Sequence, residues 1–435
     1  MGSRTRCASL FPYTKKVVRV SPEGRLDREL PLMPHQRETL LQYLKRPHLL
    51  NTSEAGTGKT LATLALVQYL DYPQTLIIAP KFLINSWKEE CAKFEIPIES
   101  LTFMTHYEVR EHKFSARLPM IMVVDESHLC FGNPDSKTYK ALMEFVKVAN
   151  PSYRILLSGT PVRNQPSELY GQIQLLGYRE LKHRRMFQER YCRMTPIYPT
   201  SPIMKETGLG DESGYLKLLY QYSWGVKLED VLSLGEIRNI EVQVEIPSAL
   251  DKALGEIIKG VPEDLIQEAL SRAMTGGRGI QVKRDTAIAK AIATCKSEFL
   301  DTLKGPTLLF TDHPDVVTIY HKHLKTPHRV IDASTKPELR AQYAKEFQDG
   351  KVDLVVCSIK CAGVGLNMYR AKYVVFSDYP WTPADYTQAR ARAYRNGNKG
   401  LVVYRIVGGH HDNHIMQLLT EKEELTNTIS RGGSV

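Results

Sequence analysis

The stretch SEAGTGKT, Ser53 to Thr60, follows the apolar patch HLLNT and precedes LATLALVQYL, residues 61–70. It fits the phosphate-loop pattern GxxxxGK[ST], with Ser53 in place of the first glycine. Gly56 and Gly58 allow backbone N–H groups to turn inward around phosphate oxygens. The segment after the loop has the apolar spacing of a helix, and a helix N-terminus favours an anion. The stretch therefore predicts a nucleotide site; a glycine-rich loop without a ligand is the alternative.

Side chains of the loop supply the other contacts that a nucleoside triphosphate requires. Lys59 reaches the outer phosphates as a point charge, and the Thr60 hydroxyl is a magnesium ligand in this pattern. We therefore expect ATP and Mg²⁺ as cofactors. The expected nucleotide contacts in the loop are Gly56, Thr57, Gly58, Lys59 and Thr60.

The segment IMVVDESH, Ile121 to His128, predicts a buried parallel strand that ends in two carboxylates. Ligands of open α/β sheets bind at the carboxyl ends of strands, so Asp125 and Glu126 should face the phosphate loop. Asp125 is suited to hold magnesium through water, and Glu126 to orient and deprotonate the attacking water. A solvated Asp-Glu loop is the alternative, but the apolar strand before the pair disfavours it.

The residues DESH after SEAGTGKT resemble the DExH box of superfamily 2 helicases and translocases, and further motifs follow in that family's order. PLMPHQRETL resembles the element in which a glutamine, here Gln36, reads the adenine edge. LIIAPKFLINSW resembles motif Ia, a strand and then a DNA-facing loop. GTPVRNQPSELY resembles motif III in the form typical of the Swi/Snf branch. TLLFTDH, VDLVVCSIKCAGVGLNM and DYPWTPADYTQARARAYRNG resemble motifs IV, V and VI, and the nucleotide contact implied in motif V is Gly365.

The segment QARARAYR reads QxxxRxxR and carries Gln388, Arg392 and Arg395. At that spacing one helix face presents all three toward a nucleotide. Two guanidinium groups there are suited to stabilise charge that develops on the γ-phosphate. The family commonly has His at the position of Tyr394 and Gln at that of Asn398, so we expect different hydrogen bonds around motif VI.

Strand signals alternate with helical stretches in two separate parts of the chain, which predicts an α/β protein. The resemblance implies two RecA-like, doubly wound parallel-sheet lobes with ATP in the cleft between them. The first part holds LIIAP, IMVVD and RILLSGT, and the second holds TLLFTD, RVIDAS, DLVVCS, YVVFSD and LVVYRIV. We expect an N-terminal extension over 1–30, lobe 1 over 31–175, a helical, basic interlobe region over 176–299, lobe 2 over 300–420 and a tail over 421–435.

Basic residues and the motif positions point to nucleic acid as the partner. The formal net charge of +10 favours a polyanion. KHRRMFQERYCRM in the interlobe region fits either a contact to a phosphate backbone or a solvated face over a small core. By motif position, the expected DNA contacts are Lys81, Thr105 and Tyr107 in lobe 1, and His313, Ser358, Lys360 and Trp381 in lobe 2. For Trp381, a core or hinge position is the alternative.

Composition excludes several other classes of protein. The 435 residues are 42% hydrophobic, without a run of about eighteen apolar residues that predicts a membrane span. Seven scattered cysteines without a CxxC pair argue against a disulfide framework or a structural zinc site. The first residues do not resemble a secretory signal, so we expect an intracellular protein, in the cytoplasm or nucleoid if it is bacterial or phage-encoded.

The motif series implies a nucleic-acid-dependent ATPase that translocates on DNA, mainly double-stranded. Compact phage and bacterial branch-migration and annealing helicases are the nearest comparison. We therefore expect remodelling of forked and four-way junction DNA in replication, recombination or repair. The alternatives are a strand-separating helicase, which requires a wedge, and an ATPase subunit of a larger restriction or remodelling complex.

Overall fold

The structure is a computed structural model of the whole chain. It describes residues 30–111, 121–163, 165–196, 200–232, 235–259, 278–362, 366, 368–378, 383–395, 398 and 400–414. The predicted N-terminal extension, Gly365 and Trp381 lie outside the described residues. Within the described ranges, no helix is long and apolar enough to cross a membrane.

Lobe 1 is built on a six-stranded sheet in the order β3-β2-β4-β5-β1-β8, in which every pair is parallel. Central strands such as β2 and β4 are buried along their whole length, as both faces of the sheet are covered. Alternate residues of β2 enter two separate cores: Ile78 packs in one and Ile77 in the other. The strands are β1 (His48–Asn51), β2 (Thr75–Ala79), β3 (Leu101–Thr105), β4 (Ile121–Asp125), β5 (Tyr153–Leu157) and β8 (Ser223–Trp224).

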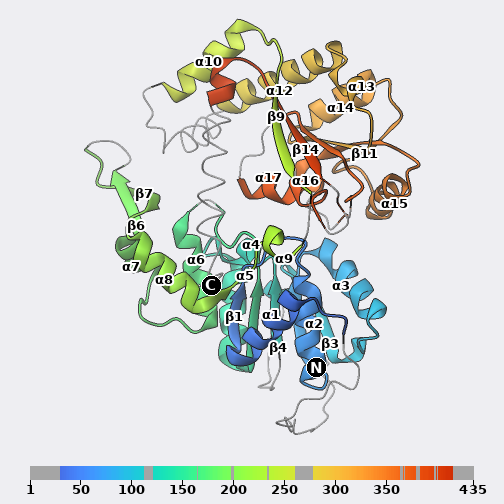
Figure 1. Cartoon of the computed structure of the whole chain (residues 1–435). Helices are drawn as coiled ribbons and strands as arrows, with labels where there is room; N and C mark the ends of the chain where they lie inside the picture. Colours follow the sequence, from blue (N-terminus) through green and yellow to red (C-terminus); the bar gives the residue numbers. More distant parts are fainter. Residues whose placement is uncertain are drawn as a thin grey trace, which may run out of the picture.

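Helices cover both faces of this sheet, and their starts lie close to the carboxyl ends of the strands (Figure 1). They are α1 (Pro34–Lys45), α2 (Lys59–Tyr69), α3 (Lys81–Lys93), α4 (His128–Phe131), α5 (Lys137–Ala149) and α6 (Leu169–Leu176). Lys81 begins α3, so the DNA-facing loop expected in motif Ia is the first turn of a helix. Pro80 precedes it as N-cap, which is a favourable place for a residue without a backbone N–H.

Lobe 2 repeats this design in a second parallel sheet, in the order β11-β12-β10-β13-β14-β9. The strands are β9 (Ile237–Gln243), β10 (Thr307–Thr311), β11 (His328–Ile331), β12 (Leu354–Ser358), β13 (Tyr373–Phe376) and β14 (Leu401–Val407). The helices are α10 (Ser248–Ile258), α12 (Arg278–Lys296), α13 (Phe299–Thr302), α14 (Pro314–His323), α15 (Pro337–Gln348), α16 (Ile359–Ala362) and α17 (Pro383–Arg390). The two parallel-sheet lobes confirm the predicted fold class.

The region between the lobes contains more strand than expected. Besides α7 (Arg184–Tyr191), α8 (Glu212–Tyr222) and α9 (Leu228–Val231), it holds the antiparallel hairpin β6 (Cys192–Pro196) and β7 (Met204–Leu209). It also supplies β8 to the sheet of lobe 1 and β9 to the sheet of lobe 2. The region expected to be helical and basic therefore contains helices together with short strands, and the sequence analysis did not predict these strands. The domain boundaries stay a prediction.

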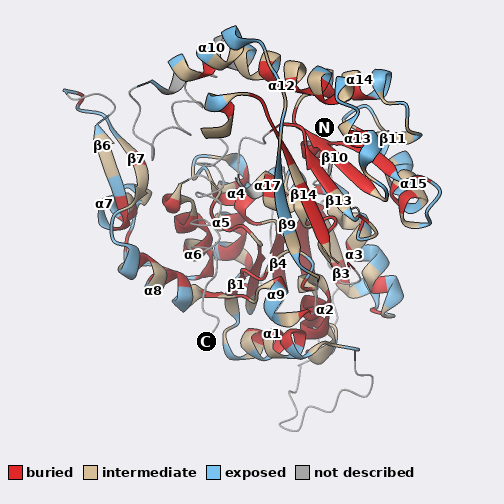
Figure 2. Ribbon diagram, turned by 45° about the horizontal axis from the view of Figure 1, so that its top comes forward, coloured by how far each residue is buried: buried red, intermediate tan, exposed pale blue. Residues whose placement is uncertain are grey.

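The core lies in the two sheets. Figure 2 shows most strands of both sheets buried, whereas the edge strand β9 is mostly exposed. Exposed residues also lie on the outer faces of α10, α12 and α15. The basic helix α7 belongs partly to this core, because Phe187 and Tyr191 are buried against Tyr215 of α8. For those aromatic residues, the small-core alternative is the one observed.

Candidate active site

The phosphate loop forms the turn between β1 and α2. Gly56 and Gly58 have φ values of 92° and 81°, in the left-handed region that favours glycine. Gly58 is the N-cap of α2, so the first backbone N–H groups of that helix point out of the loop. The Lys59 ammonium folds back over the loop and donates to the carbonyls of Ser53 at 2.7 Å and Glu54 at 3.1 Å.

Helix α1 braces this loop from outside. The Gln36 side-chain amide donates to the carbonyl of Thr57 at 3.1 Å, and its oxygen accepts from the backbone N–H of Met33 at 2.9 Å. Nε2 of His35 contacts the same Thr57 carbonyl at 2.8 Å. A Cβ on Gly58 would lie 2.1 Å from Nε2 of Gln36, so this contact requires glycine. The structure thus places Gln36 against the phosphate loop; its contact to adenine stays a prediction.

Asp125 and Glu126 stand at the end of β4, as predicted. Asp125 is buried and accepts two hydrogen bonds at 2.9 Å: one from the indole Nε1 of Trp87 and one from the backbone N–H of Glu126. Glu126 has a φ of 47°, which is rare for a residue with a side chain and turns the chain sharply after the strand. The sequence did not single out Trp87 as a site residue.

Burial sets the protonation of this group of residues. Desolvation, reinforced by the charge of Asp125, raises the pKa of Glu126 to about 7, while Lys59, Arg392 and Arg163 oppose the rise. Desolvation also raises the pKa of Asp125 and lowers that of Lys59. A carboxylate poised near neutral pH has the proton affinity that a general base requires.

The histidine of the DESH motif connects Glu126 to motif III. Nδ1 of His128 lies 2.8 Å from the Ser158 hydroxyl and 3.5 Å from Oε2 of Glu126. Desolvation lowers the pKa of His128 to about 3, so the ring is neutral at physiological pH. His128 is therefore a hydrogen-bonding link between the two motifs and not a cation beside the base.

Motif VI reaches the cleft by a turn after a helix. Helix α17 ends at Arg390. The backbone N–H of Ala391 still donates to the carbonyl four residues earlier, whereas that of Arg392 donates to the carbonyl three residues earlier. Gln388 therefore lies on α17, whereas Arg392 and Arg395 lie in the turns that follow it, so the three residues are not all on one helix as expected. Motif VI still lies at the cleft.

Both motif VI arginines lie close to residues of lobe 1 at the cleft. Arg392 is buried, and Glu126 is the charge that supports its ionised form against desolvation. Desolvation, together with Arg392, lowers the pKa of Arg395 to about 9. A Cβ on Gly56 would lie 3.5 Å from Cγ of Arg395, so this arginine of lobe 2 packs against the loop of lobe 1.

A cavity of about 420 Å³ joins the two lobes at this point. One wall holds Lys59 and Glu126, and another holds Gln388, Arg390 and Tyr394. Arg390, which is not one of the three residues of the QxxxRxxR pattern, also lines this cavity. The connecting segment completes the wall with Leu228, Glu229 and residues 235–237.

The connecting segment is tied to both lobes. The backbone N–H of Leu228 donates to the carboxylate of Glu54 at 3.0 Å in the phosphate loop. The Tyr394 hydroxyl donates to the carbonyl of Gly235 at 3.0 Å, so the tyrosine that replaces the family's histidine links motif VI to this segment. Movement of motif VI relative to the loop would therefore also move the connection between the lobes.

Arg163 of motif III is a second site residue that the sequence did not single out. Its guanidinium contacts the carboxylate of Asp385 in α17 at 3.1 Å, across the two lobes. Its charge also favours the ionised form of Glu126. The contact to Asp385 depends on the packing of the two lobes, which no local sequence pattern reveals.

The residues of the cleft fit ATP and Mg²⁺. The loop backbone, Lys59 and the helix N-terminus suit the phosphates. The Asp125 carboxylate, held in place by Trp87 at the strand end, and the hydroxyl of Thr60 at the start of α2 would hold the ion. Mg²⁺ bound there with ATP would neutralise charge on the phosphate oxygens.

The expected DNA contacts lie at the carboxyl ends of strands in both lobes. In lobe 1, Thr105 ends β3 opposite Ala79 of β2, Lys81 is exposed, and Tyr107 is 63% exposed. The backbone N–H of Thr105 donates to Glu108 at 2.7 Å, so part of this residue already serves the local turn.

In lobe 2, Ser358 ends β12 opposite Thr311 of β10, and His313 follows β10 as the N-cap of α14. Ser358 is buried, and Nε2 of His313 lies 4.0 Å from the carboxylate of Asp378. Lys360 falls in α16, but its side chain is outside the described atoms. All these contacts stay predictions.

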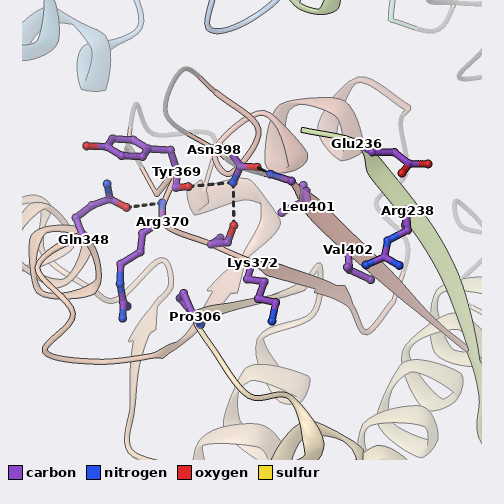
Figure 3. A pocket seen from close by; sticks show the side chains of 12 residues that line it. Glu236, Arg238, Pro306, Gln348, Tyr369, Arg370, Lys372, Asn398, Leu401 and Val402 are labelled. Carbon is purple, nitrogen blue, oxygen red and sulfur yellow. Dashed lines mark hydrogen bonds between the residues drawn. The ribbon is translucent and has the colours of Figure 1, made fainter. Parts of the chain in front are cut away.

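A second cavity, of about 740 Å³, lies in lobe 2 at the amino ends of β13 and β14 (Figure 3). Asn398, which stands where the family commonly has glutamine, lies in the wall of this cavity. The Asn398 amide donates to the carbonyls of Tyr369 at 3.0 Å and Ala371 at 2.8 Å, and its oxygen accepts from the N–H of Gly400. Asn398 therefore fixes the turn between motif VI and β14.

Two parallel-sheet lobes that share one cavity, with a phosphate loop and paired carboxylates facing arginines, define a helicase-type ATPase core. The SNF2-related domain matches residues 91–218, and the helicase conserved C-terminal domain matches residues 290–397. The chain belongs to the Swi/Snf type of superfamily 2 helicases, which confirms the resemblance seen in its motifs.

Curated relatives match along most of the chain. One, from Caenorhabditis elegans, is a homologue of "SWI/SNF-related matrix-associated actin-dependent regulator of chromatin subfamily A-like protein 1"; it is 25% identical over 441 residues, covering 92% of this chain and 62% of its own. Another is human "DNA annealing helicase and endonuclease ZRANB3", 26% identical over 445 residues, covering 92% of this chain and 40% of its own. The chain thus spans less than two thirds of the length of each of these relatives.

A solved structure also matches, the "Sulfolobus solfataricus SWI2/SNF2 ATPase core in complex with dsDNA". The identity is 20% and the TM-score 0.41, over 93% of this chain and 94% of that one.

Proposed function

We propose that this protein hydrolyses ATP to move along double-stranded DNA, and that it remodels forks and four-way junctions. The observation that carries the proposal is the shared cavity, in which Lys59 and Glu126 of lobe 1 face motif VI of lobe 2. Because both lobes contribute to one nucleotide site, binding and release of the nucleotide change how the lobes are held together. Relative movement of two DNA-binding lobes is what translocation requires.

Each residue has a distinct part in the proposed reaction. Lys59 and the loop amides bind the phosphates, and Glu126 takes a proton from the attacking water. Arg392 and Arg395 stabilise the negative charge that develops on the transferred phosphoryl group. Arg163, paired with Asp385, holds lobe 2 against this site. The reaction is therefore complete only when the lobes are closed.

The net charge of the chain and the names of its relatives support DNA as the polymer along which the protein moves. The net charge of +10 favours a polyanion, and contacts through the phosphate backbone are largely independent of sequence. The relatives include proteins named for DNA annealing and for regulation of chromatin. Branched DNA is proposed on the name of the relative that is a DNA annealing helicase. Such an activity places the protein in the compartment that holds the DNA.

The test is steady-state ATP hydrolysis without nucleic acid and with single strands, linear duplex and a four-way junction. We expect stimulation by duplex and junction well above that by single strands, and its loss in Glu126→Gln. Stimulation by single strands alone would contradict duplex translocation and favour a strand-separating helicase. A rate that none of the DNAs changes would contradict the proposal for the isolated chain.

A further inference from the structure

The hairpin β6–β7 projects from lobe 1 and is not part of either main sheet. Its pairing runs from Cys192 opposite Leu209 to Pro196 opposite Met204, with an irregularity in register between Arg193 and Met194. Figure 1 shows it standing clear of the body of lobe 1, beyond α7 and α8, and extending in the direction of lobe 2. A two-stranded hairpin is marginally stable alone, so its base must be held by other elements.

A buried carboxylate holds that base. Glu206 of β7 is 3% exposed and accepts hydrogen bonds from the backbone N–H of Ser167 at 2.8 Å and from Nε2 of Gln188 at 2.9 Å. The Ser167 hydroxyl also donates to Glu206 and accepts from the Arg184 guanidinium at 2.9 and 3.1 Å. A satisfied, buried polar network of this kind fixes the direction in which the hairpin points.

Aromatic packing adds to this anchor. The ring of Phe187 lies 4.9 Å from that of Tyr191 and 6.1 Å from that of Tyr215, and all three are buried. The anchored segment also borders the active site, because Ser167 belongs to motif III and the backbone N–H of Arg163 in the same motif donates to Glu168 at 2.7 Å. The base of the hairpin and the ATP cleft therefore share the segment that includes Arg163 and Glu168.

The outer end of the hairpin exposes apolar side chains. Ile203 is 60% exposed and Met204 is 48% exposed, and they are adjacent in the chain. Pro196 and Pro202 beside them are exposed as well, and so is the basic residue Arg193 of the same hairpin. Scattered exposed apolar residues are ordinary, but a group at the end of an anchored projection is suited to contact a partner.

We infer that this end of the hairpin contacts the branch point of forked or junction DNA, with Ile203 and Met204 against an exposed base face and Arg193 near the backbone. The inference rests on the proposed function. Apolar side chains such as Ile, Met and Pro are the ones that proteins insert against bases, while cations meet phosphates. Linear duplex hides its base faces by stacking, so only a branch point or an end offers this apolar surface.

The test compares Ile203→Ala/Met204→Ala with Leu339→Ala, which alters an exposed apolar residue (39%) of α15 in lobe 2. All three side chains are exposed, so each variant should fold. Binding to a fork and to linear duplex of equal length is measured by fluorescence anisotropy, with 2-aminopurine at the branch as a local probe. We expect the ratio of the affinity for the fork to that for linear duplex to be about fivefold to tenfold lower in the hairpin variant, a difference of about 1 to 1.4 kcal/mol in binding free energy. Leu339→Ala should match the wild type.

The 2-aminopurine signal at the branch should fall in the hairpin variant, while duplex-stimulated ATP hydrolysis stays at the wild-type rate. An unchanged fork preference and probe signal would overturn the inference, and would leave the apolar end for a protein partner. An equal loss on fork and linear duplex would also overturn it, because the contact would then be a general one. If wild-type hydrolysis did not respond to DNA, the proposed function would fail separately, since fork binding is read without ATP.

Discussion

Arg163 and Asp385 form an ion pair of 3.1 Å between the two lobes and join positions 222 residues apart in the chain. Their side chains are 27% and 29% exposed, so water screens the pair only in part. Because Arg163 also favours the ionised form of Glu126, one side chain contacts the opposite lobe and influences the catalytic carboxylate. Under the proposed function, Arg163 therefore links the contact between the lobes to the charge of the base.

Removing the Asp385 charge should slow hydrolysis more than it weakens ATP binding. For Asp385→Asn we expect kcat to fall about fivefold to thirtyfold, the effect of losing about 1 to 2 kcal/mol of a half-buried pair in the closed state. Asp349→Asn, which alters an exposed pair with Lys345 in the same lobe, is the matched control. In a double-mutant cycle, Asp385→Asn should cost little when Arg163 is already alanine; full additivity of the two losses would show that the pair does not act as a unit.

The pKa of Glu126, about 7, predicts the pH dependence of hydrolysis. The base must be ionised, so kcat/KM for ATP should rise between pH 6 and pH 8 and level off above. His128, neutral at these pH values, should not add a second transition. A rising limb centred near the ordinary glutamate value of 4.5 would contradict the role of burial.

The raised pKa of Glu126 also makes the free energy of unfolding depend on pH, but this free energy falls as the pH rises, whereas the rate of hydrolysis should increase. The folded state holds this proton more tightly than the unfolded chain, so Glu126 lowers stability as pH rises from about 4.5 through about 7. Glu126→Gln removes that loss. Its melting temperature, relative to that of the wild type, should therefore be higher at pH 8 than at pH 5.

Gly58→Ala should disrupt the phosphate loop, since the added Cβ would meet Nε2 of Gln36 at 2.1 Å. We expect ATP affinity to fall about tenfold or more, from backbone strain of roughly 1 to 2 kcal/mol and displacement of the brace. Gly177→Ala, also at positive φ but with open space around the new Cβ, is the control and should leave ATP affinity unchanged. Isothermal titration with a non-hydrolysable analogue measures both, and equal losses would contradict a steric cause.

Trp87→Phe should weaken the binding of Mg²⁺ at Asp125. The change keeps a buried ring but removes the 2.9 Å indole hydrogen bond, which to a carboxylate is worth about 1.5 to 3 kcal/mol. We expect the half-saturating Mg²⁺ concentration to rise about tenfold. In Trp224→Phe it should stay constant, because in the described part of the chain the Trp224 indole nitrogen has no hydrogen-bond partner. No change in Trp87→Phe would show that Asp125 does not need this support.

Local patterns predict the residues whose roles depend on their neighbours in the chain. The loop that carries Lys59 and the strand that ends at Asp125 are each predicted by a pattern of eight consecutive residues. All five strands predicted for lobe 2 are present. Residues that act across the fold left no such signal. Trp87 meets Asp125 from another element, and Arg163 meets Asp385 only after both lobes have packed.

The corrected expectations have physical causes as well. Spacing alone placed Arg392 and Arg395 on a helix, but the hydrogen bonding tightens after Arg390 and the helix ends. The two-residue strand β8 is too short to show an alternating pattern, yet it completes the edge of the lobe 1 sheet beside β1. Pairing with β1, which a single segment does not encode, makes β8 a strand.

The central claim is that hydrolysis in the shared cavity drives movement along intact duplex. Displacement of a labelled third strand from a triplex placed on linear duplex tests it most directly. With ATP and Mg²⁺, the wild type should release the third strand while the duplex stays paired, and Glu126→Gln should not. Duplex-stimulated hydrolysis without release of the third strand, or release only with separation of the duplex strands, would contradict translocation on double-stranded DNA.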